Sequence, residues 1–166
     1  MTHPISSLGI AHTVISLVPM VAGIAAFARR GAIDVSKFDG KVYLASLALS
    51  VVTSFGLSST GGFNAGHALG IVALVVSFGT LLLPSMRWLG RARPYLTVLG
   101  LSFSFFLLLV PGINETLTRL PASAPIASGI DSPVVQGALK AWVAIFVIGV
   151  AVQCWALRKR RAIIRS

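Results

Sequence analysis

Five long apolar stretches constrain this chain more than any other feature of its sequence. A helix that crosses about 30 Å of hydrocarbon needs roughly 20 mostly apolar residues. Stretches of this kind cover residues 8–28, 42–59, 67–84, 95–112 and 135–157. Mean hydropathy is +0.89 and only 11% of residues are charged, against about a quarter in soluble domains. The sequence therefore predicts an all-α integral membrane protein with five transmembrane helices.

The positions of the basic residues predict how these helices cross the membrane. Twelve of the fourteen Lys and Arg residues follow the first, third or fifth stretch, and only Arg119 and Lys140 lie on the opposite side. Because loops rich in Lys and Arg stay in the cytoplasm, we expect a bacterial-type inner (plasma) membrane protein. Its N-terminus is then outside, and its basic tail, residues 158–166, is cytoplasmic. Since the basic residues flank apolar stretches, they predict contact with the lipid bilayer and no nucleic-acid partner.

The chain contains two similar units. In each, a histidine opens an apolar stretch, a loop of the form basic-aromatic-x-Gly-basic follows, and a second stretch returns. The two loops read Lys37-Phe38-Asp39-Gly40-Lys41 and Arg87-Trp88-Leu89-Gly90-Arg91. We expect one membrane domain, residues 1–166, with repeat one at about 8–59, repeat two at about 66–112 and a fifth span at about 135–157. Such parallel repeats form two helical hairpins about a pseudo-twofold axis; the alternative is convergence of interfacial residues in unrelated hairpins.

The loop elements resemble those of a known family. Lys37-x-x-Gly40-Lys41-x-Tyr43-Leu44 is similar to the His-Arg-x-x-Gly-Arg-x-Tyr element of a family of uncharacterised bacterial predicted multi-helix membrane proteins, and Arg87-Trp88-x-Gly90-Arg91 resembles it again. The resemblance covers roughly residues 12–108. Ser36 and Met86 stand where the family has its leading histidine, so no role of that histidine carries over. The resemblance implies a bacterial membrane protein with several helices and implies no activity.

Two histidines occupy corresponding places in the two units. His12 lies about one turn into the first stretch and His67 begins the third, so we expect both near the outer interface, facing the repeat axis. Two imidazoles from facing helices are the ligands of a b-type haem. We therefore expect His12 and His67 to bind haem iron, in an electron-transfer protein whose partner is a quinone or a redox protein. Two histidines without an intramembrane carboxylate are too few for a closed zinc or di-iron site.

Other interpretations of the histidines stay open. An interfacial histidine also bonds to water or backbone, and His67 then caps a helix that begins at the turn. The chain is in that case a non-enzymatic membrane protein or a complex subunit of unknown role. Two options remain: the histidines bind copper with Met20 as a further ligand, or they contact a proton or a quinone. Nothing in the sequence resembles a nucleophile triad, which argues against an enzyme, and the oligomeric state stays open.

The four acidic residues are all expected between the apolar stretches. Asp34 and Asp39 belong to the first inner loop, and Glu115 and Asp131 belong to a long outer loop over residues 113–137. A proton-coupled carrier needs an ionisable group within a span. This placement disfavours the second alternative function, that of a small-solute transporter.

Overall fold

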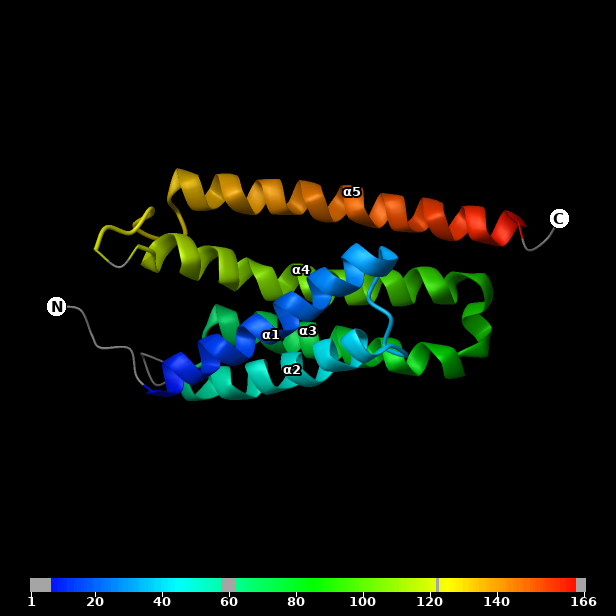
Figure 1. Cartoon of the computed structure of the whole chain (residues 1–166), viewed down its shortest axis with the longest axis horizontal. Helices are drawn as coiled ribbons and strands as arrows, with labels where there is room; N and C mark the ends of the chain where they lie inside the picture. The colour runs from blue at the N-terminus through cyan, green and yellow to red at the C-terminus, as the bar shows by residue number, and fades with distance from the viewer. Residues whose placement is uncertain (1–6, 58–61, 122, 164–166) are drawn as a thin grey trace.

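The computed structural model describes residues 7–57, 62–121 and 123–163, which form an elongated helical bundle without strands (Figure 1). The elements are α1 (Ser7–Arg30), α2 (Phe38–Ser54), η1 (Phe55–Leu57), α3 (Ala65–Gly79), η2 (Thr80–Ser85), η3 (Arg87–Ala92), α4 (Arg93–Arg119) and α5 (Pro133–Ile163). Five continuous helical segments among these residues are long and apolar enough to cross a membrane. The predicted all-helical class and the five apolar helices are confirmed.

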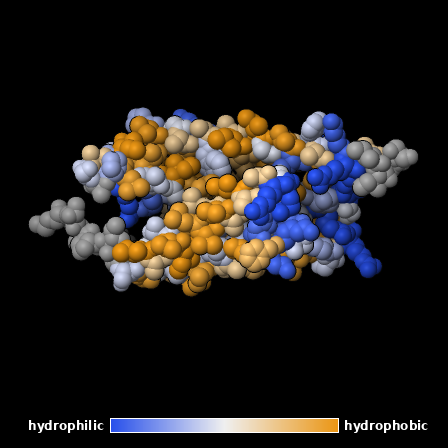
Figure 2. Space-filling model, in the orientation of Figure 1, coloured by the Kyte–Doolittle hydropathy of each residue, from blue (hydrophilic) through white to orange (hydrophobic). Residues whose placement is uncertain are grey.

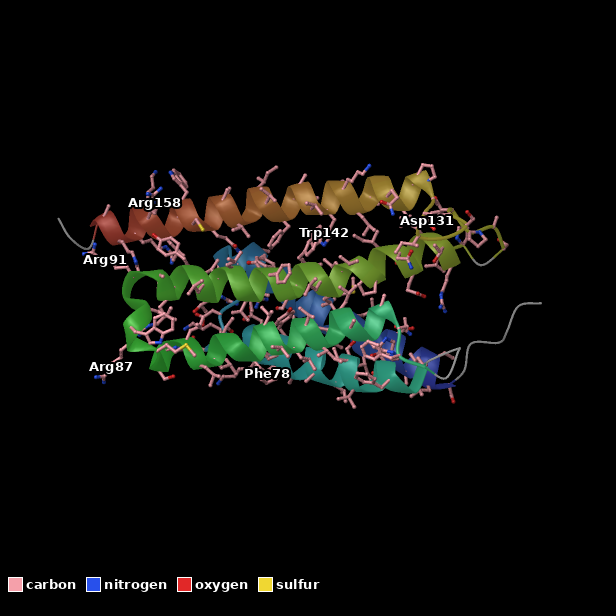
Figure 3. All side chains as sticks on the ribbon, turned by 180° about the vertical axis from the view of Figure 1, so that it is seen from behind. Phe78, Arg87, Arg91, Asp131, Trp142 and Arg158 are labelled. Carbon is pink, nitrogen blue, oxygen red and sulfur yellow. The ribbon has the colours of Figure 1, made fainter. Side chains whose placement is uncertain are left out.

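The helices run alternately up and down the bundle. The α1–α2 pair and the α3–α4 pair each form an antiparallel hairpin, and α5 lies along α4 (Figure 1). Figure 3 shows Arg87, Arg91 and Arg158 at one end of the bundle, named here the basic end, and Asp131 at the other. The fifth helix thus packs along α4, on the outside of the second hairpin.

The fourth helix is longer than the sequence predicts. The stretch was expected to end at Gly112, yet α4 continues to Arg119, and the loop before α5 shrinks from 113–137 to residues 120–132. Pro111 removes only one backbone donor, and the Thr116 hydroxyl donates to the carbonyl of Gly112 at 2.7 Å. Glu115, expected in a loop, lies on the helix and forms an ion pair with Arg119 one turn later, a spacing that supports helices.

The two loop glycines have different structural roles. Gly40 lies in the first turn of α2, where an added Cβ would overlap the carbonyl of Asp34. Gly90 lies in η3 with φ +48°, a region that L-residues with side chains rarely adopt. The neighbouring aromatic side chains, Phe38 and Trp88, are both more than four-fifths exposed. The loops therefore share exposed aromatic residues but differ in backbone structure.

The core lies where the two hairpins meet. Tyr43 and Leu47 of α2 pack with Leu101 and Phe105 of α4, and all four are at least 95% buried. Gly23 allows close contact, because a Cβ there would overlap the Phe105 ring. Large apolar side chains also cover much of the surface, and Figure 2 shows hydrophilic residues gathered toward the basic end. An apolar exterior of this kind suits a lipid environment.

Candidate functional site

His12 joins α1 to α2. Its Nδ1 lies 2.9 Å from the Thr53 hydroxyl, and its Nε2 lies 3.2 Å from the Ser16 hydroxyl. Ser16 in turn lies 2.7 Å from the Ser50 hydroxyl. Thr53 also donates to the carbonyl of Leu49 at 3.0 Å, so its oxygen is available to accept from Nδ1–H of His12. One neutral tautomer therefore satisfies the whole chain of four polar side chains.

His67 completes the N-terminal cap of α3. The Asn64 side chain accepts a hydrogen bond from the backbone N–H of His67 at 3.1 Å, and Nδ1 of His67 accepts one from the backbone N–H of Asn64 at 3.2 Å. This reciprocal pair is a capping box, so the structure shows the capping role that was an alternative interpretation. The Nε2–H of His67 donates to the carbonyl of Ser54 at 2.9 Å, and Phe55 stacks on the ring at 4.8 Å between centroids.

Both histidines therefore lie at the end of the bundle opposite the basic end, and both bond to α2. His12 reaches Thr53 from α1, and His67 reaches the adjacent residue, Ser54, from α3. A pseudo-twofold relation would pair His67 with α4 instead. All four ring nitrogens lie within hydrogen-bond distance of a protein partner. Since an axial ligand gives a ring-nitrogen lone pair to the iron, each histidine would have to release a bond to hold haem.

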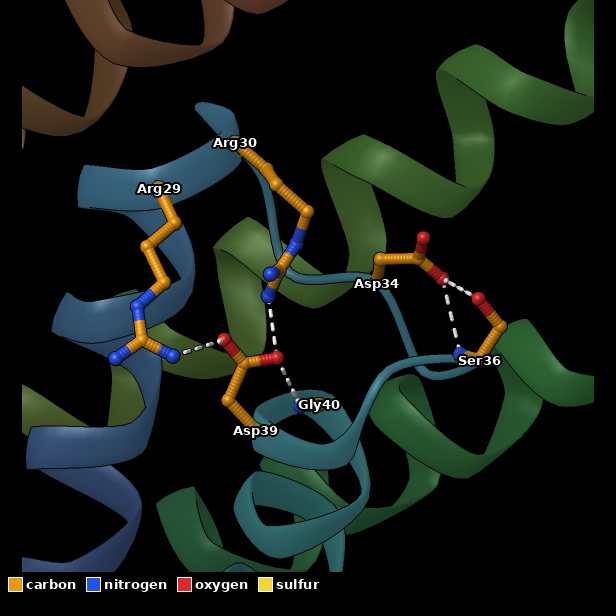
Figure 4. A network of polar contacts seen from close by, with 6 residues as sticks. All are labelled: Arg29, Arg30, Asp34, Ser36, Asp39 and Gly40. Atoms are coloured by element: carbon orange, nitrogen blue, oxygen red, sulfur yellow. Dashed lines mark hydrogen bonds and ion pairs between the residues drawn. The ribbon is translucent and has the colours of Figure 1, made fainter.

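A second polar cluster, absent from the sequence-based expectations, lies where α1 ends and α2 begins (Figure 4). Arg30 donates a hydrogen bond to Oδ1 of Asp39, which also accepts the backbone N–H of Gly40 at 2.9 Å. Arg29 approaches the other carboxylate oxygen at 3.9 Å. Asp39 was expected in a loop but lies in the first turn of α2 and is only 8% exposed. A carboxylate is favourable there because the helix dipole is positive at its N-terminus.

Asp34 closes the loop between these two helices. Its carboxylate accepts hydrogen bonds from the backbone N–H of Ser36 at 2.9 Å and from the Ser36 hydroxyl at 2.7 Å (Figure 4). Both bonds stabilise the ionised form, and the hydroxyl contact is the largest cause of a lowered Asp34 pKa. The Asp34 carbonyl accepts the backbone N–H of Lys37 at 3.0 Å and lies against Gly40, where an added Cβ would overlap it.

Gln153 ties α5 to two other helices. Its amide oxygen accepts from the Ser102 hydroxyl of α4 at 2.9 Å, and its amide nitrogen donates to the carbonyl of Gly31 at the end of α1 at 2.7 Å. Sequence reasoning missed this residue, although a Gln deep within an apolar stretch is itself a signal for an interhelical hydrogen bond. Gln153 brings the end of α1 to the basic half of α5.

Metal-ligating side chains do not gather in the part of the chain that the structure describes. No group of three or more His, Cys, Asp or Glu residues lies close enough together there to hold an ion. Cys154, the single cysteine of the sequence, is half-buried on α5. The side chains of His12, His67, Asp34 and Gln153 instead pair with other groups of the protein.

Comparisons with protein-family models, with curated proteins and with solved structures give no significant match to this chain. The loop resemblance noted from the sequence stays a prediction.

Proposed function

We propose that this protein is a non-enzymatic integral membrane protein in which His12 and His67 fasten three helices together. The observation that carries this proposal is the pairing of all four histidine ring nitrogens with Thr53, Ser16, Asn64 and Ser54. The bonds to Thr53 and Ser54 link α1 and α3 to α2, the pair with Asn64 caps α3, and the contact with Ser16 lies within α1. Buried polar groups that are fully satisfied in this way rigidify a structure, which is the role of a membrane scaffold or of a subunit in a larger complex.

Haem-mediated electron transfer is the competing function. It requires both imidazoles to turn away from α2 and toward one iron. His67 would then lose its contact with Ser54 or open the cap of α3, and His12 would lose Thr53 or Ser16. Either rearrangement gives up a hydrogen bond of the folded protein, at about 0.5–1.5 kcal/mol for each bond. The structural role needs no such rearrangement.

A visible spectrum separates the two functions. We expect protein purified in detergent from haem-replete cells to show no α-band in a dithionite-reduced minus air-oxidised spectrum. We also expect His67→Ala to lower the free energy of unfolding by about 1–3 kcal/mol, since it removes both the hydrogen bond to the Ser54 carbonyl and one half of the capping box. His3→Ala, outside the described residues, is the matched control. An α-band that disappears in both His12→Ala and His67→Ala would overturn the proposal and establish a shared haem site.

The proposed orientation places the basic end in the cytoplasm of a bacterial-type inner membrane. The concentration of Arg and Lys at that end supports it. In a Cys154→Ser background, a membrane-impermeant maleimide should label Asp131→Cys in intact cells and Lys159→Cys only after permeabilisation. The reverse labelling pattern would invert the orientation.

A further inference from the structure

An open groove runs along the outside of the α1–α2 hairpin. It has a volume of about 390 Å³, and its walls include Leu17, Val21 and Ala25 of α1 and Val42 of α2. Arg29 and Asp39 line the same groove. The groove is thus apolar along most of its length and charged where the helices reach their loop.

The length of the groove matches half of a bilayer. Leu17 and Arg29 are twelve residues apart on α1, which corresponds to about 18 Å at 1.5 Å per residue. One leaflet contributes about 15 Å of a 30 Å hydrocarbon core. If Arg29 lies at the headgroup level, the apolar wall therefore reaches to about the middle of the membrane.

The charged end of the groove is positive. Arg30 already pairs with Oδ1 of Asp39, whereas Oδ2 receives no hydrogen bond and meets Arg29 only at 3.9 Å. The Arg29 side chain is 71% exposed, so most of its surface is accessible to a ligand in the groove. Residues 29–41 carry four basic and two acidic side chains. A negatively charged group is the complement of this rim.

We infer that the groove binds one anionic phospholipid of the leaflet at the basic end. An acyl chain lies along α1 between Leu17 and Ala25, and the lipid phosphate accepts hydrogen bonds from Arg29. Basic sites between helices at this level are suited to anionic headgroups. A second copy of the same surface is a poorer occupant, because it would bring two positive rims together. The inference does not depend on the role of the histidines.

Thermal unfolding in nanodiscs tests this site. We expect phosphatidylglycerol, mixed into phosphatidylcholine, to raise the unfolding midpoint of the wild-type protein and to remain bound in native mass spectrometry. Arg29→Gln removes the phosphate ligand and leaves the Arg30–Asp39 pair in place, and Ala25→Leu fills the groove. In both variants phosphatidylglycerol should raise the unfolding midpoint much less than in the wild-type protein, and Arg29→Lys should retain part of the increase.

The controls are matched in charge and in size. Arg158→Gln removes an exposed cation of the basic end outside the groove, and Ala28→Leu enlarges an exposed residue of α1 that does not line it. In both controls phosphatidylglycerol should raise the unfolding midpoint as much as in the wild-type protein. The inference is overturned if phosphatidylglycerol gives no rise, if Arg158→Gln loses as much as Arg29→Gln, or if phosphatidylcholine is retained equally well. It is also overturned if Ala25→Leu converts a dimer to a monomer, which would make a second copy the occupant.

Discussion

The hydroxyl groups of Tyr43 and Ser104 lie 2.8 Å apart in the interior of the bundle, where neither side chain is exposed. Ser104 also donates to the carbonyl of Leu101 at 2.9 Å. Its only hydroxyl hydrogen is thereby used, so Tyr43 is the donor of the pair. This bond joins α2 to α4 and hence the first hairpin to the second.

The direction of that bond predicts unequal effects of removing its two partners. Tyr43→Phe removes the donor and leaves Ser104 bonded to Leu101, so we expect a loss of about 0.5–1.5 kcal/mol in unfolding free energy. Ser104→Ala strands the buried Tyr43 hydroxyl, and we expect about 1–3 kcal/mol. Denaturant titration in mixed micelles measures both. A larger loss for Tyr43→Phe than for Ser104→Ala would contradict the assignment.

The ion pair between α1 and α2 should be more sensitive to mutation than the exposed pair on α4. Asp39→Ala leaves Arg30, whose side chain is only 29% exposed, without its carboxylate, and removal of one partner of a shielded pair is strongly destabilising. Glu115→Gln breaks the exposed pair with Arg119 and should change stability by about 0–1 kcal/mol. The midpoint of thermal unfolding should therefore fall further for Asp39→Ala.

A double variant provides the control for that prediction. Arg30→Gln combined with Asp39→Ala removes both charges, so stability should recover in part relative to Asp39→Ala alone. No recovery would mean that Asp39 acts through the N-terminus of α2 and not through Arg30.

Substitution by alanine should change the stability of the protein in opposite directions at Gly40 and at Gly149. A Cβ at Gly40 would overlap the Asp34 carbonyl, whereas a Cβ at Gly149, within α5, meets no atom within 4 Å. Overpacking typically costs about 1–3 kcal/mol, and replacement of a mid-helix glycine by alanine gains roughly 0.5–1 kcal/mol. Unfolding free energies should thus decrease for Gly40→Ala and increase for Gly149→Ala. A neutral Gly40→Ala would show that the loop can move away from α2.

The loop at Asp34 should make stability depend on acidic pH. Because the Asp34 pKa is lowered in the folded protein, its contribution is fully present above the unfolded pKa of about 3.9. The contribution declines below that pH and is lost as pH falls through the folded pKa. Ser36→Ala removes the hydroxyl that is the largest cause of the shift, so the Asp34 pKa should rise. Carboxyl-carbon NMR titration measures the change, and an unaltered titration would contradict the hydrogen-bond explanation.

Hydropathy predicted the five apolar helices because chain length and side-chain polarity alone decide which segments can be buried in lipid. The predicted end of α4 was wrong because Pro111-Gly112 is a strong local stop signal in the sequence. In the structure the helix continues past this pair, and the Thr116 hydroxyl bonds to the Gly112 carbonyl. The polar network was missed for a different reason. Arg30 and Asp39 are separated by a loop, and Ser102 and Gln153 belong to different helices. Such pairs have no periodicity, so only the packing of the helices reveals them.

The unequal lengths of the helices have a consequence for the surrounding lipid. The α3 segment, Ala65–Ser85, covers about 32 Å at 1.5 Å per residue, close to a hydrocarbon core of about 30 Å. The α5 segment, Pro133–Ala162, covers about 45 Å on the same scale. A helix longer than the hydrocarbon core tilts or extends beyond it. Because the basic residues 158–161 lie in the last turns of α5, the excess length of this helix brings them to the lipid headgroups instead of the acyl chains.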